Sequence, residues 1–336
     1  MQTVYAVDER EKRKLRFLYQ HSGIEKRYSV LPDFSLPAPQ WSFFPATENL
    51  EPFPSIEERL EKFQEHAPAL GLDAIGKCLH CVPERKVSHL ITVSCTGMSA
   101  PGLDLELLSL LKLPANTWRT SVNFMGCYAA IHALKLADLV CRAEPGANVL
   151  IVCVECCTLH FQKDYEENSV TSSLLFGDGA AAMLVTGDTD TPGLSIDHFY
   201  SLVDNKGKED MQWDISSKGF LMQLSNQVPS MINEDFGELV NEALASHGMK
   251  KDEITDWCIH PGGKRILEAV QGALSLQNGE LAHCYDVMRE YGNMSSPTVV
   301  FVLDRIWRTI QKGEKKKIFG AAFGPGLTME SFILTA

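Results

Sequence analysis

The sequence predicts an α/β protein whose central, mostly parallel sheet is covered by helices on both faces. Two observations lead to this prediction: several short runs are apolar at every position, and they alternate with segments whose apolar residues have helical spacing. Such strands lie between helical layers, since a half-exposed strand would alternate apolar and polar residues. The 336 residues, 45% of them hydrophobic, suffice for a large core and suggest about two domains.

The elements follow one another in the order that this fold class requires. In the first half, helices are predicted at 9–28, 55–66, 71–82, 103–111 and 129–141, and strands at 89–95, 120–124, 149–154 and 180–185. Between the first two helices, a Pro-rich stretch from Pro32 to Pro54 is predicted to be irregular but ordered, because its aromatic residues can be buried.

The second half repeats this alternation of strands and helices. Helices are predicted at 232–247, 264–274, 281–291 and 297–311, and strands at 257–260 and on both sides of 324–326. The boundary between the halves is placed near 187–193, which gives an N-terminal half at 1–187 and a C-terminal half at 188–336.

Composition narrows the classes of partner and location. The net charge is −12 and no Lys/Arg-rich stripe is long, so nucleic acid is an unexpected partner. No apolar run reaches the roughly 18 residues of a membrane span, and the charged N-terminus is unlike a signal peptide. The ten cysteines are therefore expected to be reduced thiols in the cytoplasm.

Cys127 stands out among these thiols because of its local setting. It falls in FMGCYAA, where a predicted strand ends and a predicted helix begins, and Gly126 permits a tight turn. The first N–H groups of the helix are expected to favour a thiolate there, as at a nucleophile. The alternative is an inert buried cysteine at a crowded helix start.

Two further polar residues come at comparable positions in the second half. His260 ends an apolar strand before a Gly-rich turn, the edge at which α/β sheets bind ligands. Asn293 precedes a helix that begins near Pro297. Taken alone, each has a structural alternative, a core histidine and a cap. Together with a thiolate, two neutral donors can stabilise an enolate or an oxyanion, which fits decarboxylation better than hydrolysis.

Six segments in order resemble the type III polyketide synthases, the chalcone and stilbene synthase family of thiolase-like condensing enzymes. The resemblance covers nearly the whole chain and is carried by these segments: 100–104 (APGLD), 126–130 (GCYAA), 175–182 (LFGDGAAA), 259–263 (IHPGG), 292–296 (GNMSS) and 323–328 (FGPGLT). It implies a thiolase-like fold, two related βα halves with mixed sheets in five αβαβα layers.

The resemblance also implies the activity. Cys127 would accept a starter acyl group from coenzyme A, while His260 and Asn293 would drive decarboxylation of malonyl-CoA and stabilise the enolate that attacks the Cys127 thioester. Pyrone, resorcinol or chalcone-like polyketides would result. The implied partners are malonyl-CoA, an acyl-CoA starter and a second copy in a homodimer; no metal or other cofactor is implied.

Substrate-binding positions follow from the same resemblance. Phe176 matches a gatekeeper aromatic between a coenzyme A tunnel and the reaction cavity, and Gly324, Pro325 and Gly326 match a loop that shapes the cavity wall. The remaining positions implied to bind substrate are Ser295, Met222, Trp213, His160 and Lys14.

Several of these positions depart from plant members of the family. Met222 replaces a second gatekeeper phenylalanine, Trp213 stands near a usual glycine, and His160 replaces a frequent threonine. Because methionine adapts to irregular apolar ligands, Met222 suggests an aliphatic or long-chain starter. The match of Lys14 to a coenzyme A-binding base is weak, since Phe17 and His21 stand where further basic residues would be.

The resemblance further implies that the chain lacks a first strand with which family members open. That strand is expected to be central to its sheet, so that its loss would be destabilising. Two alternatives therefore remain: a truncated inactive homologue, and a fatty-acid-initiating ketoacyl synthase-like enzyme that uses a carrier protein. Two small clusters, Cys78/His80/Cys81 and Cys153/Cys156/Cys157, lack a fourth ligand and the spacing for zinc.

Overall fold

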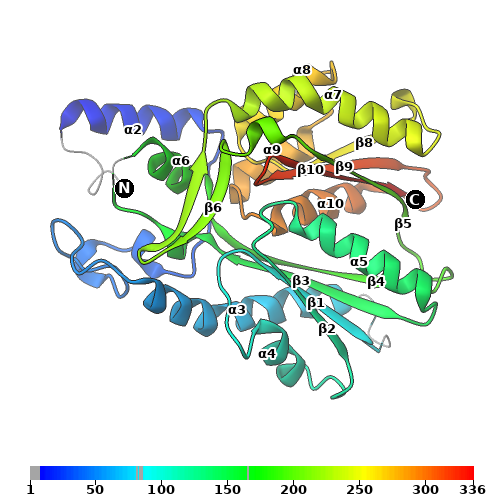
Figure 1. The fold of residues 1–336 in the computed structure, drawn as a ribbon, viewed down its shortest axis with the longest axis horizontal. Helices are drawn as coiled ribbons and strands as arrows, with labels where there is room; N and C mark the ends of the chain where they lie inside the picture. Colours follow the sequence, from blue (N-terminus) through cyan, green and yellow to red (C-terminus); the bar gives the residue numbers. More distant parts are fainter. Residues whose placement is uncertain (1–7, 81, 83–85, 165) are drawn as a thin grey trace.

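The computed structural model describes residues 8–80, 82, 86–164 and 166–336, which form two sheets in a layered arrangement (Figure 1). The first sheet has four strands in the order β2-β1-β3-β4, in which β2, β1 and β3 are parallel and β4 is antiparallel. Its strands are β1 (His89–Ser94), β2 (Trp118–Asn123), β3 (Asn148–Cys156) and β4 (Asp178–Thr186).

The second sheet repeats the pattern of the first. Its order is β5-β10-β9-β8, with β8 parallel to β9 and β10 antiparallel to both of its neighbours. Its strands are β5 (Ser195–Val203), β8 (Asp256–Ile259), β9 (Lys317–Gly324) and β10 (Thr328–Thr335). In each sheet a parallel pair is followed by an antiparallel strand, which confirms the prediction of two related halves with mixed sheets.

Helices form three layers around these sheets (Figure 1). The outer layer on the first sheet contains α3 (Ile56–Leu79) and α4 (Leu103–Leu110). The layer between the sheets contains α5 (Ala129–Ala143) and α10 (Pro297–Thr309). The outer layer on the second sheet contains α7 (Val228–Ser246) and α8 (Lys264–Ala273), and α9 (Ala282–Tyr291) lies beside α8 and α10. The predicted five-layer αβαβα arrangement is therefore confirmed.

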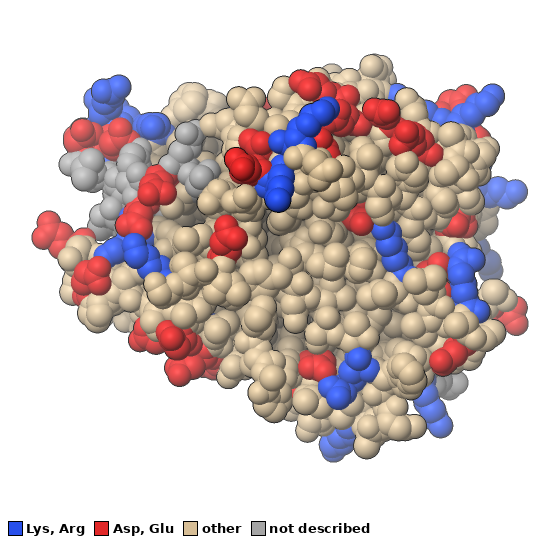
Figure 2. Space-filling view, in the orientation of Figure 1, with Lys and Arg blue, Asp and Glu red and all other residues tan. Residues whose placement is uncertain are grey.

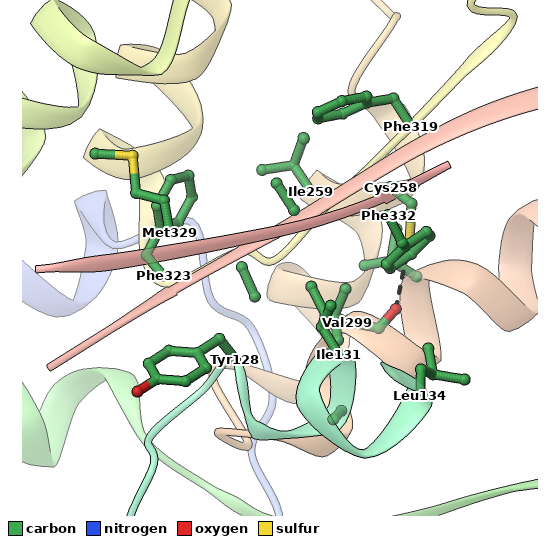
Figure 3. Packing of buried hydrophobic residues seen from close by; sticks show 14 of the residues in the cluster. Tyr128, Ile131, Leu134, Cys258, Ile259, Val299, Phe319, Phe323, Met329 and Phe332 are labelled. Carbon is green, nitrogen blue, oxygen red and sulfur yellow. Dashed lines mark hydrogen bonds between the residues drawn. The ribbon is translucent and has the colours of Figure 1, made fainter. Parts of the chain in front are cut away.

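The core between the sheets is tightly packed (Figure 3). Ile131 and Leu134 of α5 face Phe332 of β10, and Val299 of α10 accepts a hydrogen bond from the Cys258 thiol at 3.5 Å. Gly320 allows this contact, because a Cβ there would lie 1.9 Å from the ring of Phe332. The buried face of α5 thereby fixes the position of the residues that precede the helix.

Helix α3 corrects one prediction, since it continues through Pro68 where a break was expected. It begins with a capping box between Ser55 and Glu58, and Phe63, Ala67 and Ile75 lie on its buried face. A proline inside a helix costs about 3 kcal/mol. Burial of a large side chain contributes about 1.5–3 kcal/mol, so this face offsets the lost hydrogen bond.

The structure contains elements that the sequence pattern did not predict. A hairpin of β6 (Met211–Ser216) and β7 (Gly219–Leu224) lies apart from both sheets, and α6 (Glu167–Leu175) packs on β7. The first helix, α2 (Glu9–His21), is shorter than predicted because Ser22 caps it and Gly23 follows with φ +76°. None of the described helices is both long and apolar enough to span a membrane.

The first sheet leaves no gap at its centre, where the sequence analysis expected a further strand. Strands β1 and β3 pair directly with each other over His89–Val93, so no position is open between them. Within the described ranges the outer edges of β2 and β4 have no strand partner, whereas β10 is paired on both edges. The first sheet is therefore continuous, and its core forms without a further central strand.

Candidate active site

Cys127 lies on a sharp corner between β2 and α5, as predicted. The corner requires unusual backbone angles: φ is +58° at Phe124 and +85° at Gly126. A Cβ on Gly126 would lie 2.4 Å from Cδ of Pro325, so glycine is required both by conformation and by space. Strained conformations of this kind are stored mainly at functional sites.

The loop at 324–326 packs directly on this corner. A Cβ on Gly324 would lie 2.4 Å from the ring of Tyr128, and Pro325 sits against Gly126. The Thr328 hydroxyl donates a hydrogen bond of 2.9 Å to the carbonyl of Pro325, and Gly326 has φ +114°. The loop that the sequence associated with the cavity wall is thus in contact with the turn that carries Cys127.

Asn293 joins the elements of the site to one another. Its Oδ1 accepts the backbone N–H of Ser295 at 2.8 Å and lies 3.9 Å from Sγ of Cys127. Its Nδ2 donates to the carbonyl of Gly262 at 3.3 Å, in the turn that follows His260. The side chain therefore connects the cysteine corner with the histidine turn, and its amide orientation is fixed by the Ser295 N–H.

His260 is held at the carboxyl end of β8 by a hydrogen bond of 2.8 Å from its N–H to the carbonyl of Ala321. Its side chain is 1% exposed, and neither ring nitrogen has a hydrogen-bond partner among the described residues. Burial lowers the pKa of the imidazole to about 3. A neutral ring with an unused donor and an unused acceptor is unusual in a protein interior and is suited to a ligand.

Burial acts against the thiolate that the sequence analysis expected at Cys127. Burial raises the pKa of the Cys127 thiol to about 12; hydrogen bonding to Ser295 opposes this rise, and the nearby Glu155 carboxylate adds to it. The expected effect of the helix start is too weak because α5 begins at Ala129, two residues later. Burial thus favours the uncharged form of both side chains, a thiol at Cys127 and a neutral imidazole at His260.

Glu155 is a site residue that the sequence analysis missed. Its carboxylate is fully buried beneath the corner and accepts hydrogen bonds from the Cys95 N–H (2.9 Å), the Thr96 hydroxyl (2.9 Å) and the Ser296 hydroxyl (2.7 Å). Burial raises its pKa, although these hydrogen bonds oppose the rise. A carboxylate in the otherwise apolar run NVLIVCVEC was the signal that could have identified it.

Two cavities meet at the site. The larger, of about 790 Å³, opens between α2, α6 and the hairpin; we call it the vestibule. The smaller, of about 30 Å³, contains Cys127 and Ser295 and is bounded by Gly324 and Pro325; we call it the chamber. Four residues line both cavities and so form the wall between them: Cys157, Phe176, Trp213 and Met222.

This wall is anchored at Phe176 and Trp213. The backbone next to Phe176 pairs with Asn293, through Gly177 N–H to the Asn293 carbonyl and Asn293 N–H to the Leu175 carbonyl, both at 2.9 Å. The Trp213 indole N–H donates to the Cys95 carbonyl at 2.7 Å. Met222 lies opposite Trp213 across the β6–β7 hairpin.

His160 is part of the vestibule wall, with both ring nitrogens occupied within the protein. Its Nε2 contacts the Thr96 carbonyl at 2.7 Å and its Nδ1 accepts the Phe220 N–H at 3.1 Å, which assigns the proton to Nε2. Burial lowers the pKa of this histidine to about 3. The ring stacks on Phe220 at 4.2 Å. Its polar atoms therefore support the wall and do not face the cavity.

Lys14 lies on the exposed side of α2 and is not among the residues that line either cavity, whereas Tyr19 of the same helix lines the vestibule. Lys26 and Lys218 are cationic residues that do line it. On the face drawn in Figure 2, basic and acidic side chains are interspersed and no continuous basic stripe is present.

Metal ligation has no support in the described part of the chain, where no group of three His, Cys, Asp or Glu side chains is placed to hold an ion. Cys153, Cys156 and Cys157 are buried on or next to β3. Cys81, a member of the other small cluster, lies outside the described residues.

Comparison with known proteins agrees with this geometry. Models of the N-terminal and C-terminal domains of chalcone and stilbene synthases match residues 2–189 and 201–336. The alpha-pyrone synthesis polyketide synthase-like Pks18 of Mycobacterium tuberculosis is 30% identical over 97% of this chain and 83% of its own length.

Solved structures show the same likeness. PKS-I from the brown alga Ectocarpus siliculosus superposes with a TM-score of 0.90 and 31% identity, over 97% of this chain and 89% of that one. The 1,3,6,8-tetrahydroxynaphthalene synthase of Streptomyces coelicolor, a bacterial type III polyketide synthase, gives a TM-score of 0.84 and 26% identity, over 98% and 91% of the two chains.

Proposed function

Because this chain belongs to the chalcone and stilbene synthase family of type III polyketide synthases, we propose that it joins acyl groups by decarboxylative condensation of malonyl-CoA onto a starter held by Cys127. The observation that carries the proposal is the position of Asn293, within 3.9 Å of the Cys127 sulfur and hydrogen-bonded to the turn after His260. The family match favours this activity over that of a ketoacyl synthase dependent on a carrier protein.

In the first step, the Cys127 thiol attacks the carbonyl of an acyl-CoA. The thiol needs a base, and the neutral His260 imidazole has an unused acceptor nitrogen. The imidazole takes the thiol proton and returns it to the sulfur of the departing coenzyme A. The products are an acyl thioester on Cys127, free coenzyme A and a neutral imidazole.

In the second step, malonyl-CoA loses carbon dioxide. The electron pair of the broken C–C bond passes into the thioester carbonyl, whose oxygen becomes an enolate oxygen. An imidazole N–H of His260 and an amide N–H of Asn293 donate to that oxygen, and donors fixed before the reaction need no reorganisation. The α-carbon then attacks the Cys127 thioester, the new C–C bond forms, and the cysteine leaves and is reprotonated.

The vestibule is suited to the coenzyme A portion of both substrates. It is the larger cavity, it reaches the chamber at the wall that contains Phe176, and Lys26 and Lys218 on its lining can meet phosphate groups. In this arrangement Phe176 separates the coenzyme A from the reacting acyl group, and the loop at 324–326 bounds the side of the chamber that faces the nucleophile corner.

We also propose a homodimer, formed through the outer edge of β2. Large apolar side chains are exposed there on neighbouring elements: Trp118 of β2 is 71% exposed and Leu139 of α5 is 63% exposed, with Leu105 and Leu110 on α4. An apolar group of this size beside an unpaired strand edge is typical of a protein–protein interface.

The proposed activity is tested with purified protein, malonyl-CoA and a panel of acyl-CoA starters, by mass spectrometry of products and by release of labelled carbon dioxide. Cys127→Ala should abolish polyketide formation, and Asn293→Ala should lower it by at least about 100-fold. Cys78→Ala, which changes a thiol on α3 away from both cavities, is the matched control. A folded wild type that neither releases carbon dioxide nor forms polyketides would refute the proposal and favour an inactive homologue.

A further inference from the structure

Tyr128, the residue that follows Cys127, connects the two halves of the molecule beside the active site. Its carbonyl accepts the N–H groups of Ile131 at 2.9 Å and His132 at 3.2 Å, so its backbone is fixed at the start of α5. Its side chain is buried and lies against the loop at 324–326, which comes from the C-terminal half. A change at this ring is therefore transmitted directly to the adjoining Cys127.

The ring and the hydroxyl of Tyr128 make separate contacts with that loop. A Cβ on Gly324 would lie 2.4 Å from Cδ1 of the ring, so the ring packs directly on the backbone of the loop. The hydroxyl is hydrogen-bonded to Thr328, and the Thr328 hydroxyl in turn donates to the carbonyl of Pro325 at 2.9 Å. Because a hydroxyl carries a single hydrogen, Tyr128 is the donor in its bond with Thr328.

The loop is fixed within the C-terminal half by further backbone hydrogen bonds. The N–H of Gly326 donates to the carbonyl of Met211 at 3.3 Å, and the N–H of Leu327 donates to the carbonyl of Asp204 at 3.2 Å. The loop therefore keeps its place in that half, and Tyr128 holds the cysteine corner against it.

The same loop continues the strand to which His260 is bonded. The His260 N–H donates to the carbonyl of Ala321 in β9 at 2.8 Å, and β9 ends at Gly324, where the loop begins. A continuous path of packed backbone and hydrogen bonds thus leads from His260 through β9 and the loop to Tyr128, and from there to Cys127.

From this arrangement we propose that Tyr128 is a positioning residue that sets the distance between the Cys127 thiol and the His260 imidazole. The inference rests on the proposed function, in which His260 takes the thiol proton while the sulfur attacks the acyl-CoA carbonyl. Loading of the starter needs side chains from both halves. Decarboxylation of malonyl-CoA uses His260 and Asn293, which lie in one half. Tyr128 therefore governs the first reaction and not the second.

The test removes only the hydroxyl, because Tyr128→Phe keeps the ring on Gly324. Starter loading is followed with acetyl-CoA by intact mass spectrometry of the acyl-enzyme over time. Loading should be at least about 10-fold slower than in the wild type, since a misplacement of about 1 Å can cost about 100-fold in rate. Decarboxylation is measured as labelled carbon dioxide released from malonyl-CoA in the Cys127→Ala background, where no acyl group can load, and should not change when Tyr128→Phe is added.

Further variants separate this contact from general damage to the fold. Thr328→Val removes the acceptor of the Tyr128 hydroxyl and should slow loading to a similar extent. The double variant should be no slower than the slower single variant, because the two residues act through one contact. Tyr200→Phe, which removes a tyrosine hydroxyl bonded to Glu242 away from both cavities, should load acetyl groups as the wild type does.

An unchanged loading rate in Tyr128→Phe would overturn the inference. So would an equal loss of loading and decarboxylation, since a merely structural residue affects both, and so would effects of Tyr128→Phe and Thr328→Val that multiply in the double variant. In each of these cases polyketide formation by the wild type would still support the proposed function. A wild type that loads no acyl group and releases no carbon dioxide would overturn both.

Discussion

Acid should destabilise the folded protein through His260 by an amount that can be calculated. Burial lowers the pKa of this imidazole to about 3 in the folded protein, whereas an unfolded histidine has a pKa of about 6.5. Because the folded value lies below the unfolded value, the unfolded chain binds the proton more readily. The contribution of the neutral ring to stability is therefore complete above about pH 6.5 and decreases as the pH falls toward 3.

The magnitude follows from the interval between the two pKa values. At about pH 5 the unfolded chain is mostly protonated at this position and the folded chain is not, so the free energy of unfolding is lower by about 2 kcal/mol than at pH 7.5. His160, Asp178 and Glu155 also have shifted pKa values. Their contributions cancel when the wild type is compared with a variant that differs only at position 260.

The assay is urea unfolding of the wild type and of His260→Gln at about pH 7.5 and pH 5, with tryptophan fluorescence as the signal that reports unfolding. Between these two pH values the wild type should lose about 2 kcal/mol more than the variant does. His80→Gln, which changes an exposed residue at the end of α3, should behave as the wild type. If the wild type and His260→Gln lose the same amount, the argument that the folded protein keeps this ring neutral is wrong.

Three other substitutions test the corner, the buried carboxylate and the dimer surface. Gly126→Ala should destabilise the protein by about 2–4 kcal/mol, because the residue has a φ of +85° and an added Cβ would lie 2.4 Å from Cδ of Pro325. Gly146→Ala is the control and should change stability little, since Gly146 has open space around it. Equal effects of the two substitutions in a thermal melt would contradict this reasoning. Glu155→Gln removes a charge that raises the pKa of Cys127, so alkylation of that thiol should begin at lower pH, and an unchanged pH profile would show that the carboxylate has no influence. Trp118→Lys should convert a dimer to a monomer in light scattering after size exclusion, and a dimer that persists would exclude the β2 edge.

The buried strands and the residues of the candidate site could be predicted from the sequence, for a physical reason. Strands β1 and β3 are covered on both faces, so most residues along them are apolar, and the pattern is visible without the rest of the fold. Strand β5 was missed because most of its residues are only partly buried and the strand contains Asp197 and His198. The hairpin of β6 and β7 was missed because its packing depends on α6 and the vestibule wall, which are distant in sequence.

The site was predicted in its residue types and not in its dimensions. Cys127, His260 and Asn293 were predicted because each lies at a strand end or before a helix in a short local motif that the resemblance also covers. The size of the chamber depends on the anchoring of Trp213 by Cys95 and His160, which are 118 and 53 positions earlier in the sequence, and no local pattern reports such a contact.

The open edge of β4 has a consequence for how the protein behaves in concentrated solution. After Asp178 this strand has no charged residue and no proline, the two means by which exposed edges usually resist pairing with other molecules. Within the described chain its outer backbone groups have no strand partner, so another extended polypeptide can add to the sheet there. Intermolecular β-pairing at this edge is an expected route to aggregation, and a lysine introduced along β4 should reduce it without a change at the active site.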